Sequence, residues 1–168
     1  MALQLRLLFS KYFFTFLIIF VNLVKLKYRM PLTDIRWIQR FQNYKKAMSK
    51  LAEVAKSKTV NELSELEREG LIQRFECTYE LAWKTLQDLL EAKGYKNITG
   101  PNPVIEQAFQ DGYLQDSSAW KQMKKSRDLT SHTYNSETAQ DIAEKILAIY
   151  YFALKDLEDV LDLEKYGK

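Results

Sequence analysis

The scarcity of turn-forming residues is the feature that most constrains the fold of this chain. It has 168 residues but only five Gly and three Pro. A β-sandwich needs a turn about every 8–12 residues, and Gly and Pro are prominent in such turns. Leu, Ala, Glu, Lys and Gln are abundant instead, and these residues favour helices. The sequence therefore predicts an all-α fold built from long helices.

The first 29 residues differ in composition from the rest of the chain. They hold five basic residues and no acid, with an uncharged apolar run over residues 12–24. One interpretation is a membrane anchor with its basic end in the cytoplasm, another is an extraneous segment before a true start at Met30, and a third is an extra packed helix. The abrupt change in composition favours the second. It predicts a cytoplasmic protein with one domain over residues 30–168, and no membrane contact unless residues 1–29 are genuine.

The net charge of +3 comes from this N-terminal segment. Without its five basic residues the chain has 20 basic and 22 acidic residues, so the predicted domain is close to neutral. The sequence of this domain therefore lacks the overall basic charge that marks many nucleic-acid-binding proteins. A local basic cluster remains at Lys121, Lys124 and Lys125, which is either a solvated face or a phosphate contact.

Apolar spacing and capping residues predict the helices of the domain. They are expected over residues 34–57, 64–93, 102–112, 116–127, and from 136 or 138 onward. The expected N-caps are Thr33 or Asp34, Ser64, Asn102, Asp116 or Ser117, and Ser136 or Thr138. The residues predicted to face the core are Trp37, Phe41, Tyr44, Met48, Leu51, Leu71, Phe75, Tyr79 (or Thr78), Ala82, Leu86, Leu89, Ile142, Ile146, Ile149, Ala153, Leu157 and Val160. This pattern predicts an up-and-down four-helix bundle with a short extra helix.

Residues 126–135 carry the most informative side chains. They include the only His of the chain, His132, five residues after Arg127. On an unbroken helix these residues would lie about 140° apart, so they converge only if the helix ends or distorts between them, which Thr130 and Ser131 favour. A guanidinium that holds phosphate oxygens and an imidazole that moves a proton suit phosphodiester cleavage. The alternative is an Arg paired with a bundle acid and a His at a helix end.

Two acids of the second predicted helix, Glu76 and Glu80, are candidate supporting residues. One interpretation places either of them in the bundle groove, paired with Arg127. The other is an exposed or intrahelical role, such as Glu80 with Lys84. The sequence contains no Gly-rich phosphate loop, nucleophile elbow or His-Glu-x-x-His helix, and its single Cys cannot build a Cys-based zinc site. We therefore predict no cofactor and no metal site.

The chain resembles the HEPN superfamily. Arg127, His132 and Tyr134 match its Arg-x4-His-x-Tyr signature. The blocks over residues 34–51, 73–94 and 102–134 are similar to the small nucleotidyltransferase substrate-binding protein family of the bacterial HEPN/MNT branch (HepT-like). The resemblance implies a four-helix bundle that forms a homodimer. It also implies a separately encoded partner, a minimal nucleotidyltransferase (MNT).

The resemblance leaves two functions open. The chain is either a module that docks on the nucleotidyltransferase and presents its substrate, or the toxin of a toxin–antitoxin pair. In the toxin branch the Arg-x4-His motifs meet across the dimer and cleave RNA without metal, and the partner silences the toxin by adding AMP to the Tyr. Arg127 would then stabilise phosphate charge, His132 would act as base or orienting group, and Tyr134 would be modified.

Asp128 departs from the family pattern, in which the residue after the Arg is often Asn. An acid beside the scissile phosphate could repel it. The same carboxylate could instead hold Arg127 or His132 in place. The resemblance therefore includes Asp128 among the supporting residues, with its role open.

Overall fold

The structure is a computed structural model, and it describes residues 32–132 and 135–166, without the side chains of residues 32–34 and 132. Its α-helices are α2 (Leu32–Ala55), α3 (Glu65–Ala92), α4 (Pro101–Gln110), α5 (Ser117–Leu129), α6 (Ser136–Lys145) and α7 (Tyr151–Lys165). A 3-10 turn, η1 (Val60–Glu62), precedes α3, and a second one, η2 (Thr130–His132), follows α5. A π-helical segment, η3 (Ile146–Tyr150), joins α6 to α7. Across these described ranges, every helix is too short or too polar to span a bilayer.

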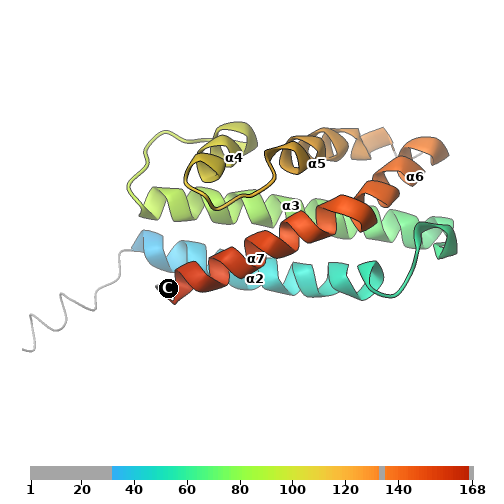
Figure 1. Cartoon of the computed structure of the whole chain (residues 1–168), viewed down its shortest axis with the longest axis horizontal. Coiled ribbons are helices and arrows are strands. Elements are labelled where there is room, and N and C mark those ends of the chain that lie inside the picture. The colour runs from blue at the N-terminus through green and yellow to red at the C-terminus, as the bar shows by residue number, and fades with distance from the viewer. Residues whose placement is uncertain (1–31, 133–134, 167–168) are drawn as a thin grey trace, which may run out of the picture. The chain divides into compact units, whose positions relative to one another are not determined.

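Consecutive long helices run in opposite directions (Figure 1). The chain goes along α2, returns along α3, goes out again along α5 and returns through α6, η3 and α7, while α4 is a short helix between α3 and α5. This arrangement confirms the predicted up-and-down four-helix bundle with a short extra helix. The predicted boundary at Met30 and the whole segment 1–29 lie outside the described residues.

The core follows the apolar stripes predicted for the first two long helices. All five predicted residues of α2 and all six of α3 are buried, and both Tyr79 and its alternative Thr78 are among them. Phe75 of α3 stacks on Tyr150 of η3, with ring centroids 5.3 Å apart. Burial of such aromatic side chains is a main source of stability in a helical bundle.

The prediction for the inward face of the last helix is wrong after Ile146. The buried positions are Tyr150, Tyr151, Leu154, Leu157 and Leu161, whereas Ile149 is 38% exposed and Ala153 and Val160 are only partly buried. The π-helical segment Ile146–Tyr150 explains the difference, because a π turn takes more residues than an α turn and moves the apolar face along the sequence. Each later inward position except Tyr151 and Leu157 therefore lies one residue beyond the predicted one.

The helix ends confirm some predicted caps and correct others. Ser64 forms a capping box with Glu67 at the start of α3, and Asp116 accepts a hydrogen bond from the Ala119 N–H at 2.9 Å. The prediction for α4 is wrong, because Gly100 adopts φ +85° and lets the helix begin at Pro101 instead of after Asn102. The cap of the last helix is Asn135, next to the predicted Ser136.

The predicted cap of α2 is also wrong. The helix begins at Leu32, so Thr33 and Asp34 lie in its first turn. An acid in the first turn still interacts favourably with the helix dipole, which explains why the sequence pattern marked the right region but not the right residue. At the other end of the next helix, Gly94 follows the C-cap with φ +98°, as expected for the residue that stops α3.

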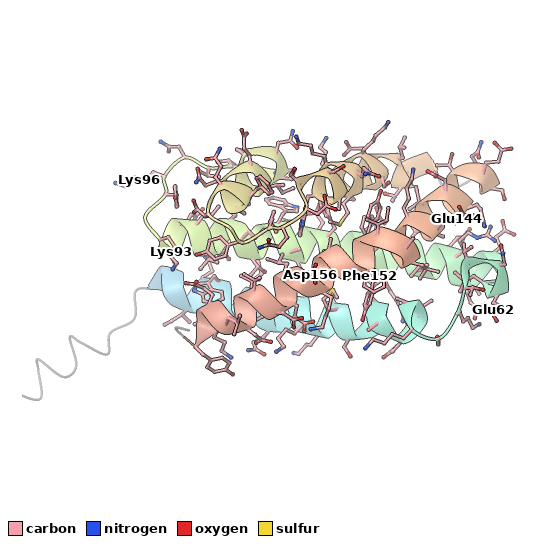
Figure 2. The ribbon with its side chains drawn as sticks, viewed as in Figure 1. Glu62, Lys93, Lys96, Glu144, Phe152 and Asp156 are labelled. Carbon is pink, nitrogen blue, oxygen red and sulfur yellow. The ribbon has the colours of Figure 1, made fainter. Side chains whose placement is uncertain are left out.

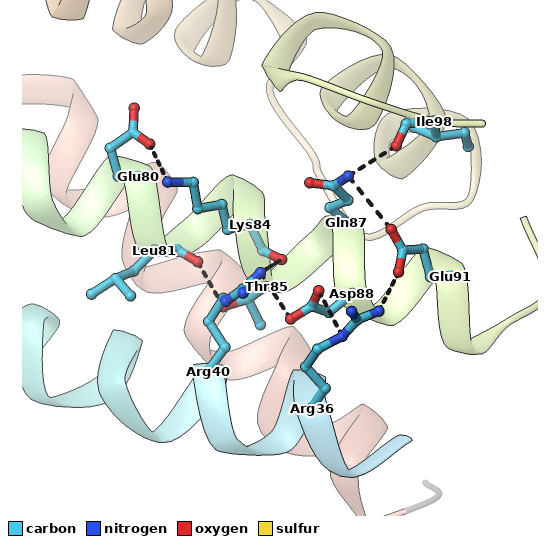
Figure 3. Close-up of polar contacts among 10 residues, drawn as sticks. All are labelled: Arg36, Arg40, Glu80, Leu81, Lys84, Thr85, Gln87, Asp88, Glu91 and Ile98. Atoms are coloured by element: carbon cyan, nitrogen blue, oxygen red, sulfur yellow. Dashed lines mark hydrogen bonds and ion pairs between the residues drawn. The ribbon is translucent and has the colours of Figure 1, made fainter. Parts of the chain in front are cut away.

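A group of charged side chains joins α2 to the C-terminal half of α3 (Figure 3). We call it the Asp88 cluster; its members are Arg36, Arg40, Asp88 and Glu91. Arg40 Nη1 lies 2.8 Å from Asp88 Oδ2 and donates to the Lys84 carbonyl oxygen at 3.0 Å, and Arg36 Nε lies 3.2 Å from Asp88 Oδ1. Burial raises the pKa of Asp88, although Arg40 and Arg36 lower it.

A second ion pair fixes α3 to α7. Lys93, labelled in Figure 2 at the C-terminal end of α3, pairs with Glu164. This hydrogen bond to Glu164 is the main reason that the pKa of Lys93 is raised. The bundle is thus held at this end by charge pairs as well as by its apolar core.

Candidate functional site

The candidate site lies where α5 ends. The helix stops at Leu129 and continues as the 3-10 turn Thr130–His132, so the expected break falls between Arg127 and His132. Two buried hydroxyls hold this end of α5 in place. Ser126 Oγ lies 2.8 Å from the Tyr150 hydroxyl, and the Thr130 hydroxyl donates to the Arg127 carbonyl oxygen at 2.7 Å.

Arg127 is held loosely by two carboxylates of α3. Its Nη1 lies 3.5 Å from Glu76 Oε1, and its Nε lies 3.7 Å from Glu80 Oε1. Both separations exceed the 2.7–3.2 Å range of ordinary N–H···O hydrogen bonds. Arg127 Nε is buried and has no hydrogen-bond partner among the described residues, while the side chain as a whole is 38% exposed. The guanidinium is therefore positioned by charge and keeps donor capacity.

The two carboxylates that face Arg127 also have other partners. Glu76 accepts a hydrogen bond from the Thr130 hydroxyl, and Glu80 Oε2 lies 3.1 Å from Lys84 Nζ. Both interpretations of Glu80, the contact with Arg127 and the intrahelical pair with Lys84, therefore describe contacts that are present. Shared partners weaken the hold of each carboxylate on Arg127.

Asp128 does not pair with Arg127 in the described contacts. Its Oδ2 lies 2.6 Å from Lys124 Nζ, one turn earlier on α5, and its side chain is 56% exposed. This pair places the negative charge of Asp128 beside a positive one. Of the two effects considered for Asp128, repulsion of a phosphate is thus reduced by Lys124.

The structure places the other predicted site residues only in part. The backbone of His132 belongs to the 3-10 turn after α5, but its side chain and all of Tyr134 lie outside the described residues. Their catalytic and modification roles stay predictions. Within the described ranges, no group of three or more His, Cys, Asp or Glu side chains is arranged to hold a metal ion.

Two neighbours of Arg127 were missed as site residues by the sequence analysis. Thr130 was noted only as a helix breaker, yet it links Glu76 to the end of α5. Tyr79 was assigned to the core, and its buried hydroxyl has no hydrogen-bond partner in the described part of the chain. Burial raises the pKa of Tyr79, Glu80 and Asp128 raise it further, and Arg127 lowers it. Tyr79 is therefore a neutral O–H donor close to Arg127, which an apolar stripe cannot reveal.

Comparison with known families and curated proteins gives a consistent result. The family described as nucleotidyltransferase substrate binding protein like matches residues 39–162. A Haemophilus influenzae protein named Probable ribonuclease HepT is 32% identical over 81 residues, which cover 46% of this chain and 56% of that protein. The chain thus matches little more than half the length of this relative.

Two solved structures share the fold. A crystal structure of a Thermus thermophilus protein has a TM-score of 0.61 and 35% sequence identity, and covers 71% of this chain and 96% of its own. A Haemophilus influenzae structure, described as revealing the fold of a substrate binding domain of a nucleotidyltransferase, has a TM-score of 0.55 and 21% identity. It covers 77% of this chain and 98% of its own. At that identity the second likeness concerns the fold alone.

Proposed function

The chain belongs to the nucleotidyltransferase substrate binding protein like family, in the HEPN and HepT-like group, and we propose that it is the helical partner of a separately encoded minimal nucleotidyltransferase. The family match over residues 39–162 is the observation that carries this proposal. The two proteins would form a toxin–antitoxin pair in which the nucleotidyltransferase modifies Tyr134. The Tyr134 hydroxyl would attack the α-phosphorus of ATP, pyrophosphate would leave, and an AMP group would remain on the side chain.

Co-purification and mass spectrometry test this partnership. The full chain, expressed with the minimal nucleotidyltransferase encoded beside it, should form a stable complex and gain the mass of one AMP group. Tyr134→Phe should prevent the gain, whereas Tyr166→Phe, at a tyrosine that is 69% exposed, should not. Failure to form a complex, or AMP on a residue other than Tyr134, would contradict the proposal.

A second function, metal-independent RNA cleavage, is supported by the state of Arg127. Both of its carboxylate contacts exceed hydrogen-bond distance and its side chain is 38% exposed, which leaves donors for the oxygens of a phosphodiester, and an arginine can bind such oxygens in a fork. The H. influenzae relative named a probable ribonuclease supports the same chemistry. In a homodimer, two copies of Arg127 and His132 would face one RNA strand.

The proposed reaction is a transesterification. His132, whose ordinary pKa is about 6.5, takes the proton of a ribose 2′-hydroxyl or orients it. The 2′-oxygen attacks the adjacent phosphorus, the bond to the 5′-oxygen breaks, and that oxygen leaves with a proton. Arg127 stabilises the charge that develops on the non-bridging oxygens. The products are a 2′,3′-cyclic phosphate end and a 5′-hydroxyl end.

A cleavage assay with a matched arginine control tests this function. The full chain should cut single-stranded RNA in the presence of EDTA and leave cyclic phosphate ends. Arg127→Ala and His132→Ala should each lower the cleavage rate by about 100-fold or more. Arg74→Ala should not, although Arg74 is equally exposed at 38% and also pairs with a glutamate, Glu53. Equal loss in all three variants, or cleavage that survives without Arg127, would reject the ribonuclease.

A further inference from the structure

A cavity of about 630 Å³ lies between α4 and α5, the two helices that follow one another above α3 in Figure 1. Its apolar wall consists of Ile105 and Phe109 from α4 and Trp120 from α5. Phe109 is 43% exposed, whereas Trp120 is 1% exposed and packs against Tyr79, with ring centroids 6.2 Å apart. The cavity thus has a rigid aromatic wall and one open aromatic ring, and its volume is typical of small-ligand sites.

The polar lining of the cavity suits a nucleotide. Lys121 and Lys124 of α5 bring two ammonium groups, and Asn102 and Gln110 of α4 bring two amides. Among the described residues no carboxylate pairs with Lys121, whereas Lys124 pairs with Asp128. An aromatic ring on which a base stacks, next to lysines that contact phosphate, is the usual combination in proteins that bind single-stranded nucleic acid.

The α5 residues that line the cavity end at Lys124, three residues before Arg127. Ser117, Lys121, Lys124 and Arg127 are spaced four, three and three residues apart, which puts them on neighbouring positions of one helix flank. Gln122, Lys125 and Leu129 line a different cavity, together with Asp141 and Lys145. Lys124 is therefore one turn from the arginine that would hold the scissile phosphate, and the α4–α5 cavity is next to it on the same side of the helix.

We infer that the α4–α5 cavity is a subsite for the nucleotide next to the scissile phosphate of a single-stranded RNA. This inference rests on the proposed ribonuclease function and adds to it the means by which the strand is held. The base stacks on Phe109 with one edge toward Asn102 and Gln110, and Lys121 contacts the phosphate of that nucleotide. Stacking accepts any base, so this contact supplies affinity more than sequence preference.

Glu106, the acid that lines the cavity, gives the subsite its selectivity. A carboxylate accepts hydrogen bonds and donates none, so it favours a base edge that carries an exocyclic amino group, as adenine and cytosine do. Uracil lacks that group. The subsite therefore binds adenylate more tightly than uridylate, and Glu106→Gln reduces the difference because an amide both donates and accepts.

Binding of an RNA that cannot be cleaved separates the subsite from the nuclease chemistry. The probes are fluorescent 2′-O-methyl oligoadenylate and oligouridylate, titrated with the full chain and followed by anisotropy. Phe109→Ala should weaken oligoadenylate binding at least about fivefold, the lower end of the loss seen at base-stacking aromatics. Lys121→Ala should reduce the slope of log K against log salt by about 0.7, the value for one phosphate contact to a single strand.

Two matched controls accompany these variants. Phe152→Ala removes another exposed aromatic ring, on α7 (Figure 2), that is 57% exposed. Lys125→Ala removes a neighbouring lysine that lines the other cavity. Both should bind the probe as the unaltered chain does. Thermal unfolding of every variant identifies any loss that comes from misfolding.

The outcomes separate the two proposals. If the full chain binds oligoadenylate through Phe109 and Lys121 but never cuts RNA, the subsite stands and the ribonuclease fails. If it cuts RNA through Arg127 while Phe109→Ala and Lys121→Ala bind and cut normally, the subsite is wrong. The subsite is also wrong if Phe109→Ala weakens only the complex with the nucleotidyltransferase, because the cavity would then be a protein contact.

Discussion

Two clusters join carboxylates of α3 to arginines of other helices. They differ in how fully the arginine is paired. In the Asp88 cluster, Arg40 lies 2.8 Å from a nearly buried carboxylate and donates to a backbone carbonyl at 3.0 Å. In the middle of α3, Arg127 approaches Glu76 and Glu80 only to 3.5 and 3.7 Å. Its Nε has no hydrogen-bond partner in the described part of the chain.

This difference in pairing indicates which arginine is structural and which is available to a ligand. An arginine that lies against a buried acid and donates to a backbone carbonyl fixes two helices together, as Arg40 fixes α2 to α3. An arginine that is oriented by shared carboxylates but not saturated can exchange weak contacts for the oxygens of a phosphodiester. The comparison assigns stability to the Asp88 cluster and supports our proposal that Arg127 binds phosphate.

The largest expected effect is on RNA cleavage by Arg127→Ala. Removal of one group that stabilises developing charge lowers the rate by about 100-fold or more. The free energy of unfolding should change by less than about 1 kcal/mol, because contacts of a partly exposed ion pair contribute little. Initial cleavage rates and urea unfolding measure the two quantities. A large loss of stability with little loss of rate would place Arg127 with the structural arginines.

Arg40→Ala should give the opposite result. It leaves the buried Asp88 carboxylate with Arg36 alone and removes a hydrogen bond to the Lys84 carbonyl oxygen. We expect a loss of about 2 kcal/mol in the free energy of unfolding, below the cost of a fully unpaired buried charge because one partner remains. Cleavage at 25 °C should be unchanged. An unfolding midpoint equal to that of the unaltered chain would show that Arg40 does not stabilise the fold.

Glu76→Gln tests whether the charge of Glu76 holds Arg127 in position. The amide keeps the size of the side chain and can still accept from the Thr130 hydroxyl, but it loses the charge that attracts Arg127. Cleavage should fall about threefold, in line with the modest energy of a partly exposed pair. Glu91→Gln, the equivalent change in the Asp88 cluster, should leave the rate unaltered. Identical rates for Glu76→Gln and the unaltered chain would show that the carboxylate does not position Arg127.

The smallest effect concerns the pH dependence of the Asp88 cluster. Burial raises the pKa of Asp88 above its ordinary 3.8, so the folded state binds this proton more tightly than the unfolded state does. The contribution of this tighter proton binding to the free energy of unfolding is fully present below pH 3.8. It is lost as the pH rises through the raised pKa of Asp88. The unaltered chain should therefore lose stability relative to Asp88→Asn over that rise, as urea unfolding at several pH values would measure. A relative gain would mean that Arg36 and Arg40 outweigh the burial.

The sequence predicts the fold well because local patterns and the core agree over α2 and α3. The apolar stripes of both helices, the Ser64 capping box and the Gly94 stop are all visible in the spacing and the residue types. The inward face of the last helix could not be predicted in the same way. The spacing of Ile146, Ile149 and Ala153 does not indicate the π-helical segment. The segment occurs together with the stacking of Tyr150 on Phe75, which is a tertiary contact and cannot be read from local spacing.

The contacts around Arg127 were predictable in the residues that make them but not in their geometry, and the roles of His132 and Tyr134 stay predictions. The motif marks Arg127, and a spacing of four marks Glu76 and Glu80 on α3. That both acids approach the same arginine depends on how α5 packs against α3, which helical periodicity does not specify. The cavity beside Phe109 was invisible for the same reason, since α4 and α5 each contribute one wall.

NMR of the arginine side chains shows directly which arginine turns to phosphate. The Nε–H resonances of the full chain labelled with nitrogen-15 would be followed while 2′-O-methyl oligoadenylate is added. The Arg127 resonance should shift to a saturable limit as its donors turn to phosphate oxygens, and the Arg40 resonance should stay in place. An Arg127 resonance that does not move while the probe is bound, or equal shifts for both arginines, would contradict the account.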